Sequence, residues 1–232
     1  MMIELITIIV AISAVTIAMI IDSTAWHIRA LSRIEERGLF ISRTNIFLYG
    51  GRFFSLLYMT SLSYLVDIRS TAKEIILISA IGFFFSSLAN HMALGIRPVR
   101  KRFVERAAWA LRLPHRSHDI GAAHFRIFSR DSLKSPLFIL SSLATFVFSM
   151  GISIPYVVAS IFPEYRMTFN NLGQIINSLG MLLVLLVIDN RMYRDWDHGT
   201  ILQSNEIYTS SRTCGLMMAS IFYLVAIGIM VA

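Results

Sequence analysis

Six long apolar runs most constrain what this chain can fold into. A helix needs about 20 apolar residues to cross the hydrocarbon core of a bilayer, and these runs are of that order. Because lipid offers the backbone no hydrogen-bond partners, such runs must be helical. We therefore predict an all-α polytopic membrane protein with a single integral membrane domain over residues 1–232. The predicted spans are about 3–21, 42–66, 74–95, 136–161, 171–188 and 213–231.

The composition excludes the main soluble classes. Hydrophobic residues make up 56% of the chain and charged residues 15%, whereas soluble domains carry roughly 25% charged residues. An ordinary soluble enzyme and a disordered chain are therefore excluded, and a single cysteine, Cys214, excludes a disulfide scaffold. The first run is expected to be a retained helix rather than a signal peptide, because it carries Glu4 instead of a basic leader and is too long.

Basic residues are distributed unevenly between the predicted loops. Loops 22–41, 96–135 and 189–212 hold 16 of the 21 Lys and Arg residues, and two more lie in the second span. The termini and the two remaining loops hold only three. Cytoplasmic loops carry such an excess of positive charge. We therefore predict that these three loops are cytoplasmic and that both termini lie outside.

Loop 96–135 is the only long loop, and it holds ten basic residues. Its segment 98–113 is basic, with apolar residues at helical spacing. One interpretation is an interfacial amphipathic helix held by anionic phospholipid. The other is that the charge only fixes topology. A nucleic-acid partner is not expected, because no recognition motif accompanies the charge. The apolar residues at helical spacing are Val99, Phe103, Ala107 and Leu111.

Arg52 is the most informative polar residue in a predicted span. It follows Arg43 by nine positions, which places it about 13 Å deeper along a helix. An arginine near the bilayer centre costs at least ~2.5–3.5 kcal/mol unless it faces a cavity or a partner. The flanking Gly50 and Gly51 permit close helix approach. Arg52 is thus predicted to bind an anion in a polar cavity, and the alternative is a structural ion pair.

Three spans carry small or polar residues on one helical face. Such stripes serve helix packing or line a cavity, and we leave both interpretations open for the fifth span. Packing is favoured for the fourth span, where Pro155 predicts a kink. The stripes are Ser79, Gly82, Ser86 and Asn90; Ser142, Thr145, Ser149 and Ser153; and Asn170, Gly173, Gln174, Asn177 and Gly180.

Titratable residues close three spans at the predicted cytoplasmic side. Asp22 closes the first span, His91 lies near the end of the third, and Asp189 closes the fifth. The carboxylates could orient an arginine or exchange a proton. The nearby Trp26 and Arg29 are interpreted as interface anchors.

Common catalytic motifs are absent from the sequence. There is no phosphate-binding loop of the Gly-x-x-x-x-Gly-Lys-Ser/Thr type and no His-Glu-x-x-His metal helix. The Gly-x-Ser-x-Gly elbow of serine hydrolases is missing as well. We therefore predict no catalytic residues, no metal and no cofactor.

Three segments resemble the alternate lipid II flippases (Amj). The run from Ile21 to Arg29 resembles the end of that family's first helix, and Asn45, Arg52 and the run 65–67 resemble its second. The run 185–189 resembles a late helix that ends in aspartate. The likeness covers about a third of the chain, and Gly51 stands where the family has Ser before its arginine. It implies a divergent member with six helices in the bacterial cytoplasmic (inner) membrane.

The resemblance implies a lipid II flippase of unknown oligomeric state, with lipid II or a related polyprenyl-pyrophosphate lipid as its partner. On this hypothesis Arg52 pairs with the pyrophosphate and Arg43 captures it at the entry. The alternatives are a membrane enzyme acting on a lipid phosphate and a scaffold subunit of a cell-envelope complex. Sugar or peptide contacts are assigned to Asn45, Asn90, Gln174 and Asn177, and coupling roles to Asp22, His91 and Asp189.

Overall fold

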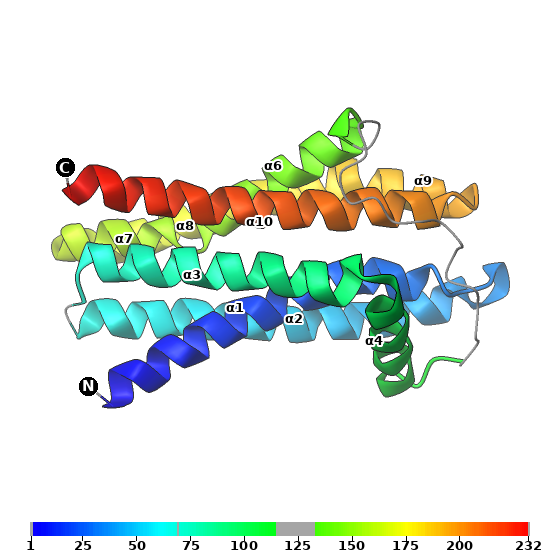
Figure 1. The fold of residues 1–232 in the computed structure, drawn as a ribbon, viewed down its shortest axis with the longest axis horizontal. Coiled ribbons are helices and arrows are strands. Elements are labelled where there is room, and N and C mark those ends of the chain that lie inside the picture. Colours follow the sequence, from blue (N-terminus) through cyan, green and yellow to red (C-terminus); the bar gives the residue numbers. More distant parts are fainter. Residues whose placement is uncertain (1, 69, 115–132, 232) are drawn as a thin grey trace.

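The protein is a bundle of long helices (Figure 1). The computed structural model describes residues 2–68, 70–114 and 133–231, and these residues form helices and connections but no strand. The α-helices are α1 (Met2–Arg29), α2 (Arg37–Asp67), α3 (Ala72–Asn90), α4 (Arg97–Ala110), α6 (Pro136–Gly151), α7 (Ile154–Ile161), α8 (Arg166–Leu183), α9 (Asn190–Asp197) and α10 (Ile201–Val231). Short 3-10 helices η1 (Ile34–Glu36) and η3 (Pro163–Tyr165) and π-helices η2 (His91–Gly95) and η4 (Val184–Asp189) connect them.

Five stretches of the described chain are long and apolar enough to cross a membrane. This confirms the all-α polytopic class. The sixth predicted span is α2, which has 31 residues but carries Arg37, Arg43 and Arg52 and is not among the five. It packs against α1, which crosses it at an angle (Figure 1). The five stretches are Met2–Arg29, Ala72–Gly95, Pro136–Ile161, Pro163–Asp197 and Ile201–Met230.

The helices extend beyond several predicted boundaries. The first was expected to end at residue 21 but continues to Arg29, and the last begins at Ile201 rather than at 213. The fifth continues through η4 and α9 to Asp197. Helical hydrogen bonding does not stop where apolar residues stop, so each of these helices is longer than the apolar span predicted within it. Asp22 and Asp189 therefore lie within continuous helices rather than at their ends.

The first turn of α1 and the last turn of α10 lie at the same end of the bundle (Figure 1). The connections after α1, after α3 and after α9 lie at the opposite end, which we call the basic end. An even number of passes along the bundle follows. The predicted assignment of the basic end to the cytoplasm stays a prediction, and residues 115–132 of the basic loop lie outside the described residues.

The predicted kink at Pro155 is confirmed as a break between α6 and α7. The proline ring removes one backbone hydrogen bond and clashes with the carbonyl four residues earlier, which belongs to Gly151. Helix α8 crosses at this break: a Cβ on Gly173 would lie 2.3 Å from Pro155 Cγ and 3.0 Å from the Gly151 carbonyl oxygen. The small residues of the fourth and fifth spans therefore serve close packing here.

Hydroxyl groups of the predicted stripes also join helices. Tyr58 on α2 is fully buried, and its hydroxyl lies 3.2 Å from Ser79 Oγ on α3 and 2.8 Å from Ser153 Oγ at the break. Ser142 on α6 donates to the carbonyl of Ser211 on α10. The packing interpretation of the third and fourth spans thus accounts for these contacts.

Candidate functional site

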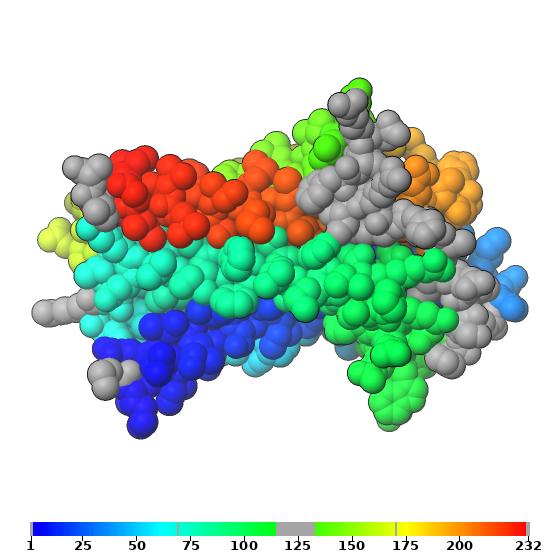
Figure 2. Space-filling model, viewed as in Figure 1, coloured from blue at the N-terminus to red at the C-terminus, as the bar shows by residue number. Residues whose placement is uncertain are grey.

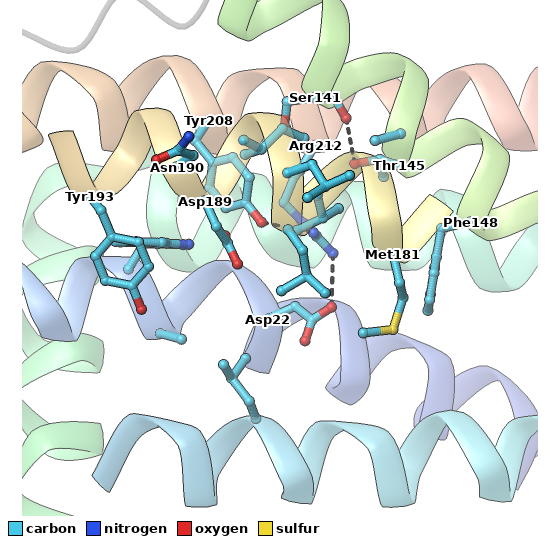
Figure 3. Close-up of a pocket in the computed structure, with 18 of the residues that line it drawn as sticks. Asp22, Ser141, Thr145, Phe148, Met181, Asp189, Asn190, Tyr193, Tyr208 and Arg212 are labelled. Carbon is cyan, nitrogen blue, oxygen red and sulfur yellow. Dashed lines mark hydrogen bonds and ion pairs between the residues drawn. The ribbon is translucent and has the colours of Figure 1, made fainter. Parts of the chain in front are cut away.

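A cavity of about 660 Å³ lies inside the bundle (Figure 3). Its wall is built from α1, α2, α6, α10 and the segment from the end of α8 through η4 to α9. Charged and polar side chains from all of these elements meet there, among apolar residues such as Phe148 and Met181. The polar lining residues include Asp22, Arg29, Asn45, Arg52, Ser141, Thr145, Asp189, Asn190, Tyr208 and Arg212.

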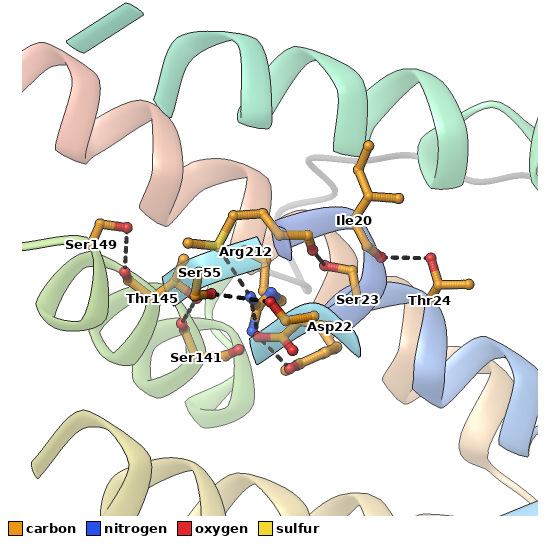
Figure 4. A network of polar contacts seen from close by, with 12 residues as sticks. Ile20, Asp22, Ser23, Thr24, Ser55, Ser141, Thr145, Ser149 and Arg212 are labelled. Atoms are coloured by element: carbon orange, nitrogen blue, oxygen red, sulfur yellow. Dashed lines mark hydrogen bonds and ion pairs between the residues drawn. The ribbon is translucent and has the colours of Figure 1, made fainter. Parts of the chain in front are cut away.

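Arg212 is anchored in the cavity wall. Its Nη2 donates to the Asp22 carboxylate over 3.3 Å (Figures 3 and 4). Its Nη1 donates to the hydroxyl of Tyr208, which lies beside it in Figure 3, over 3.0 Å. The side chain of Arg212 is 7% exposed and that of Asp22 is 36% exposed. The arginine is therefore fixed and desolvated, whereas the carboxylate remains open to the cavity.

Two buried polar atoms on the wall have no hydrogen-bond partner among the described residues. They are the Nε of Arg212 and the Oγ of Ser141. Buried polar groups are nearly always hydrogen-bonded, so such atoms point to a ligand or water in the adjoining space. A donor from arginine and a hydroxyl together suit an anionic, oxygen-rich ligand.

Arg29 is a second buried arginine on the wall. Its Nε donates to Thr44 Oγ1 over 2.9 Å, and its Nη2 donates to Asn45 Oδ1 over 2.8 Å. Its guanidinium lies 4.6 Å from the centre of the Trp26 ring. With 3% of its surface exposed, Arg29 is an internal residue. The interface-anchor interpretation did not anticipate these contacts, which hold the side chain of Arg29 between α1 and α2 although it is the last residue of α1.

Arg52 lies at the midpoint of α2, since 52 is the mean of the helix bounds 37 and 67. It lines the cavity but is exposed, and its guanidinium lies 5.2 Å from the Tyr49 ring centre. Its charge acts on Asp22. Only one of the flanking glycines is needed for close approach: a Cβ on Gly51 would lie 2.9 Å from Ile21 Cγ2, whereas one on Gly50 would meet nothing within 4 Å.

Asp189 ends the π-helix η4 and faces the cavity. Its carboxylate accepts a hydrogen bond from Trp26 and lies within the field of Arg29 and Arg212. Single π-helical turns within α-helices are rare and occur frequently at functional sites. Within the same η4 segment, Asp189 contributes a carboxylate to the cavity wall and the exposed Leu186 contributes an apolar side chain to its edge.

The cavity thus combines three arginines with two aspartates. If all are ionised, the wall carries one excess positive charge. Arginine is the cation best suited to planar, bidentate contacts with phosphate oxygens. The arrangement therefore favours an anion over a cation as ligand.

The structure brings four of the nine predicted site residues to this cavity, namely Asp22, Asn45, Arg52 and Asp189. The other five do not line it. Asn90 is buried and donates to Thr213 Oγ1 and the Thr209 carbonyl, so it joins α3 to α10. The remaining residues are Arg43 and Gln174, which are exposed, His91, which is half-buried at the start of η2, and Asn177, which packs at Gly151.

Sequence reasoning missed Arg212, Arg29 and Tyr208. Arg212 was assigned to the predicted cytoplasmic loop 189–212, among the basic residues that orient the chain, because the apolar run of the last span begins only after it. The spacing of Tyr208 and Arg212, four residues apart on one helical face, is the only signal that could have indicated an internal pair.

These features define a polytopic, all-α membrane protein with a cavity between its helices whose wall carries charged and polar side chains. Comparison with protein-family models, curated proteins and solved structures finds no match. Within residues 2–68, 70–114 and 133–231, no group of three His, Cys, Asp or Glu residues is placed to hold a metal ion.

Proposed function

We propose that this protein moves a lipid with an anionic headgroup across the bacterial cytoplasmic membrane, and that the headgroup is a polyprenyl-linked pyrophosphate saccharide such as lipid II. The observation that carries the proposal is the cavity with Arg29, Arg52 and Arg212 on its wall. A phosphate that crosses the hydrocarbon core alone must lose its hydration. A cationic cavity inside the bundle replaces water with fixed donors.

The state of each arginine supports a division of roles. Arg212 and Arg29 are held by internal hydrogen bonds and form a fixed wall. Arg52 is exposed, and its guanidinium lies over the Tyr49 ring rather than in a hydrogen-bonded network like that of Arg29, so it can move with a ligand. On this proposal Arg52 binds the pyrophosphate first, and Arg212 receives it.

Asp22 competes with the ligand for Arg212. Its carboxylate occupies the position on Arg212 that a phosphate oxygen would take. Binding of the pyrophosphate displaces Asp22, and its return expels the anion on the other side. A carboxylate in this role links transport to protons or to the membrane potential, which acts on each charge that crosses.

The cavity is of the size that small ligands occupy, about 300–1,000 Å³. It therefore suits the pyrophosphate and the adjoining sugar, while the hydrocarbon tail stays in lipid. Exposed leucines beside the cavity support this arrangement. Leu185 and Leu186 on η4 line it and are 54% and 69% exposed, so they give it an apolar rim.

A depletion assay tests the proposal. The chain is expressed in a bacterium whose essential lipid II flippase can be shut off, and externally accessible lipid II is measured. We expect growth and accessibility to be restored by the wild type but not by Arg52→Ala, with both proteins present in the membrane in equal amounts. Failure of the wild type would overturn lipid II as the substrate, and phosphate release from undecaprenyl pyrophosphate by purified protein would establish a lipid phosphatase instead.

A further inference from the structure

Helix α4 runs across the direction of the long helices at the basic end of the bundle (Figure 1). When the bundle stands across a membrane, a helix in this orientation lies along the membrane surface. In the space-filling view the same segment projects sideways from the bundle (Figure 2). Its position is therefore that of an interfacial helix.

The inner face of α4 holds it firmly to the bundle. Arg100, Val104 and Ala108 are buried, and Val104 and Ala108 pack in a cluster with Ile28 of α1. Arg100 forms an ion pair with Glu206 of α10 over 3.6 Å. Burial lowers the pKa of Arg100, and the Glu206 carboxylate acts in the opposite direction.

Both ends of α4 are also fixed. Pro98 lies in its first turn, where the preset φ of proline favours helix start. At the other end Arg112 has φ of +53°, and the Leu113 amide donates back to the Ala108 carbonyl, which is a Schellman-type helix end. Leu113 is buried in the same cluster as Val104. The helix is therefore a rigid element rather than a loose basic arm.

The outer face of α4 is exposed and basic. Arg102, Arg106 and Trp109 follow one another at spacings of four and three residues, so they share the face opposite Val104. Trp109 is 76% exposed. Within the described chain no carboxylate forms an ion pair with Arg102 or Arg106. The helix carries five basic residues and one acidic residue, a balance of +4.

Three of the four residues of the predicted apolar stripe pack against the bundle. Phe103, Ala107 and Leu111 are partly buried against the cluster that holds Val104, whereas Val99 is 43% exposed. The face opposite Val104 carries guanidinium groups and an indole, which is the combination that binds at an anionic membrane interface.

We propose that α4 is a docking surface for anionic phospholipids, with Arg102 and Arg106 contacting lipid phosphates and Trp109 inserted at the headgroup level. The occupant is the bilayer itself, because the helix lies across the bundle and its charge complements the anionic leaflet. This binding is independent of what the internal cavity carries.

Quenching by brominated lipid tests the proposal on the full chain. The protein is reconstituted in phosphatidylcholine vesicles that contain equal mole fractions of brominated phosphatidylglycerol or brominated phosphatidylcholine. The contribution of Trp109 is obtained by subtracting the emission of Trp109→Phe. We expect quenching by the anionic lipid to exceed that by the zwitterionic lipid about fivefold or more, because each basic residue near a surface adds about that factor.

Charge variants test whether the preference for anionic lipid comes from α4 or from the overall positive charge of the basic end. Arg102→Gln/Arg106→Gln should abolish the preference, whereas Arg33→Gln/Arg194→Gln, which removes two exposed charges from the same end of the bundle, should retain it. Equal quenching by both lipids, or a preference that survives Arg102→Gln/Arg106→Gln, would overturn the proposal. Absence of Trp109 quenching by either lipid would place α4 in water and would overturn it as well.

Discussion

The guanidinium of Arg212 lies 3.3 Å from the carboxylate of Asp22, although 190 positions separate the two residues in the chain. The contact joins the last helix to the first across the internal cavity. One partner is almost entirely enclosed and the other is open to the cavity. A ligand that replaces the carboxylate therefore finds the cation already in place, which reduces the cost of ordering it.

Removal of the Arg212 side chain should impair both stability and transport. Arg212→Gln leaves Asp22 and the Tyr208 hydroxyl without their cationic partner, and we expect a loss of about 1–3 kcal/mol. Thermal unfolding in detergent and externally accessible lipid II report the two effects separately. Asp22→Asn should lower stability less than Arg212→Gln does, because the oxygen of the asparagine amide still accepts a hydrogen bond from Arg212. An Arg212→Gln variant as stable as wild type would contradict the internal pairing.

Arg52→Ala should abolish transport with little change in stability. Its side chain is exposed and makes one ring contact, so the free energy of unfolding should change by no more than ~0.5 kcal/mol. Arg33→Ala, which removes an exposed arginine away from the cavity, is the matched control. Arg43→Ala should reduce transport less than Arg52→Ala does, because Arg43 does not line the cavity. A larger loss of transport in Arg43→Ala than in Arg52→Ala would move the entry site to Arg43.

Two glycine substitutions should have opposite effects on stability. A Cβ on Gly215 would lie 2.6 Å from the Ser142 carbonyl oxygen, so Gly215→Ala must separate α10 from α6 and should cost about 1–3 kcal/mol. A Cβ on Gly50 would meet nothing within 4 Å, so Gly50→Ala should leave stability unchanged or raise it by up to ~1 kcal/mol. Equal unfolding temperatures for the two variants would show that the α6–α10 crossing is looser than observed.

A cysteine introduced at Ser55 should report the charge of the cavity. Ser55 lines the wall, and in a Cys214→Ser background Ser55→Cys should react about tenfold faster with an anionic than with a cationic thiosulfonate reagent. Leu77→Cys lies on the exposed apolar surface of α3 and should remain unreactive in lipid. A faster reaction with the cationic reagent would indicate that the aspartates dominate the cavity field.

Much of the fold could be predicted from the sequence for a physical reason. Lipid forces backbone hydrogen bonds into helices, so apolar length alone indicated an all-α bundle, and Pro155 indicated where one helix breaks. Arg52 was recognisable because a charge within an apolar run is costly. The helices α1 and α10 are longer than the apolar spans predicted within them, since helical hydrogen bonds continue through polar residues.

Only the tertiary structure decided which polar residues meet. Asp22, Arg29 and Arg212 each resemble ordinary end-of-span residues in the sequence, and their shared position depends on how the helices cross and rotate against one another. Asn90 had the same sequence character as Asn45, yet it bonds to α10 while Asn45 lines the cavity. The sequence by itself thus determined the helices, because helical hydrogen bonds are local. The site depends on the packing between helices, because its contacts join residues that are distant in the chain.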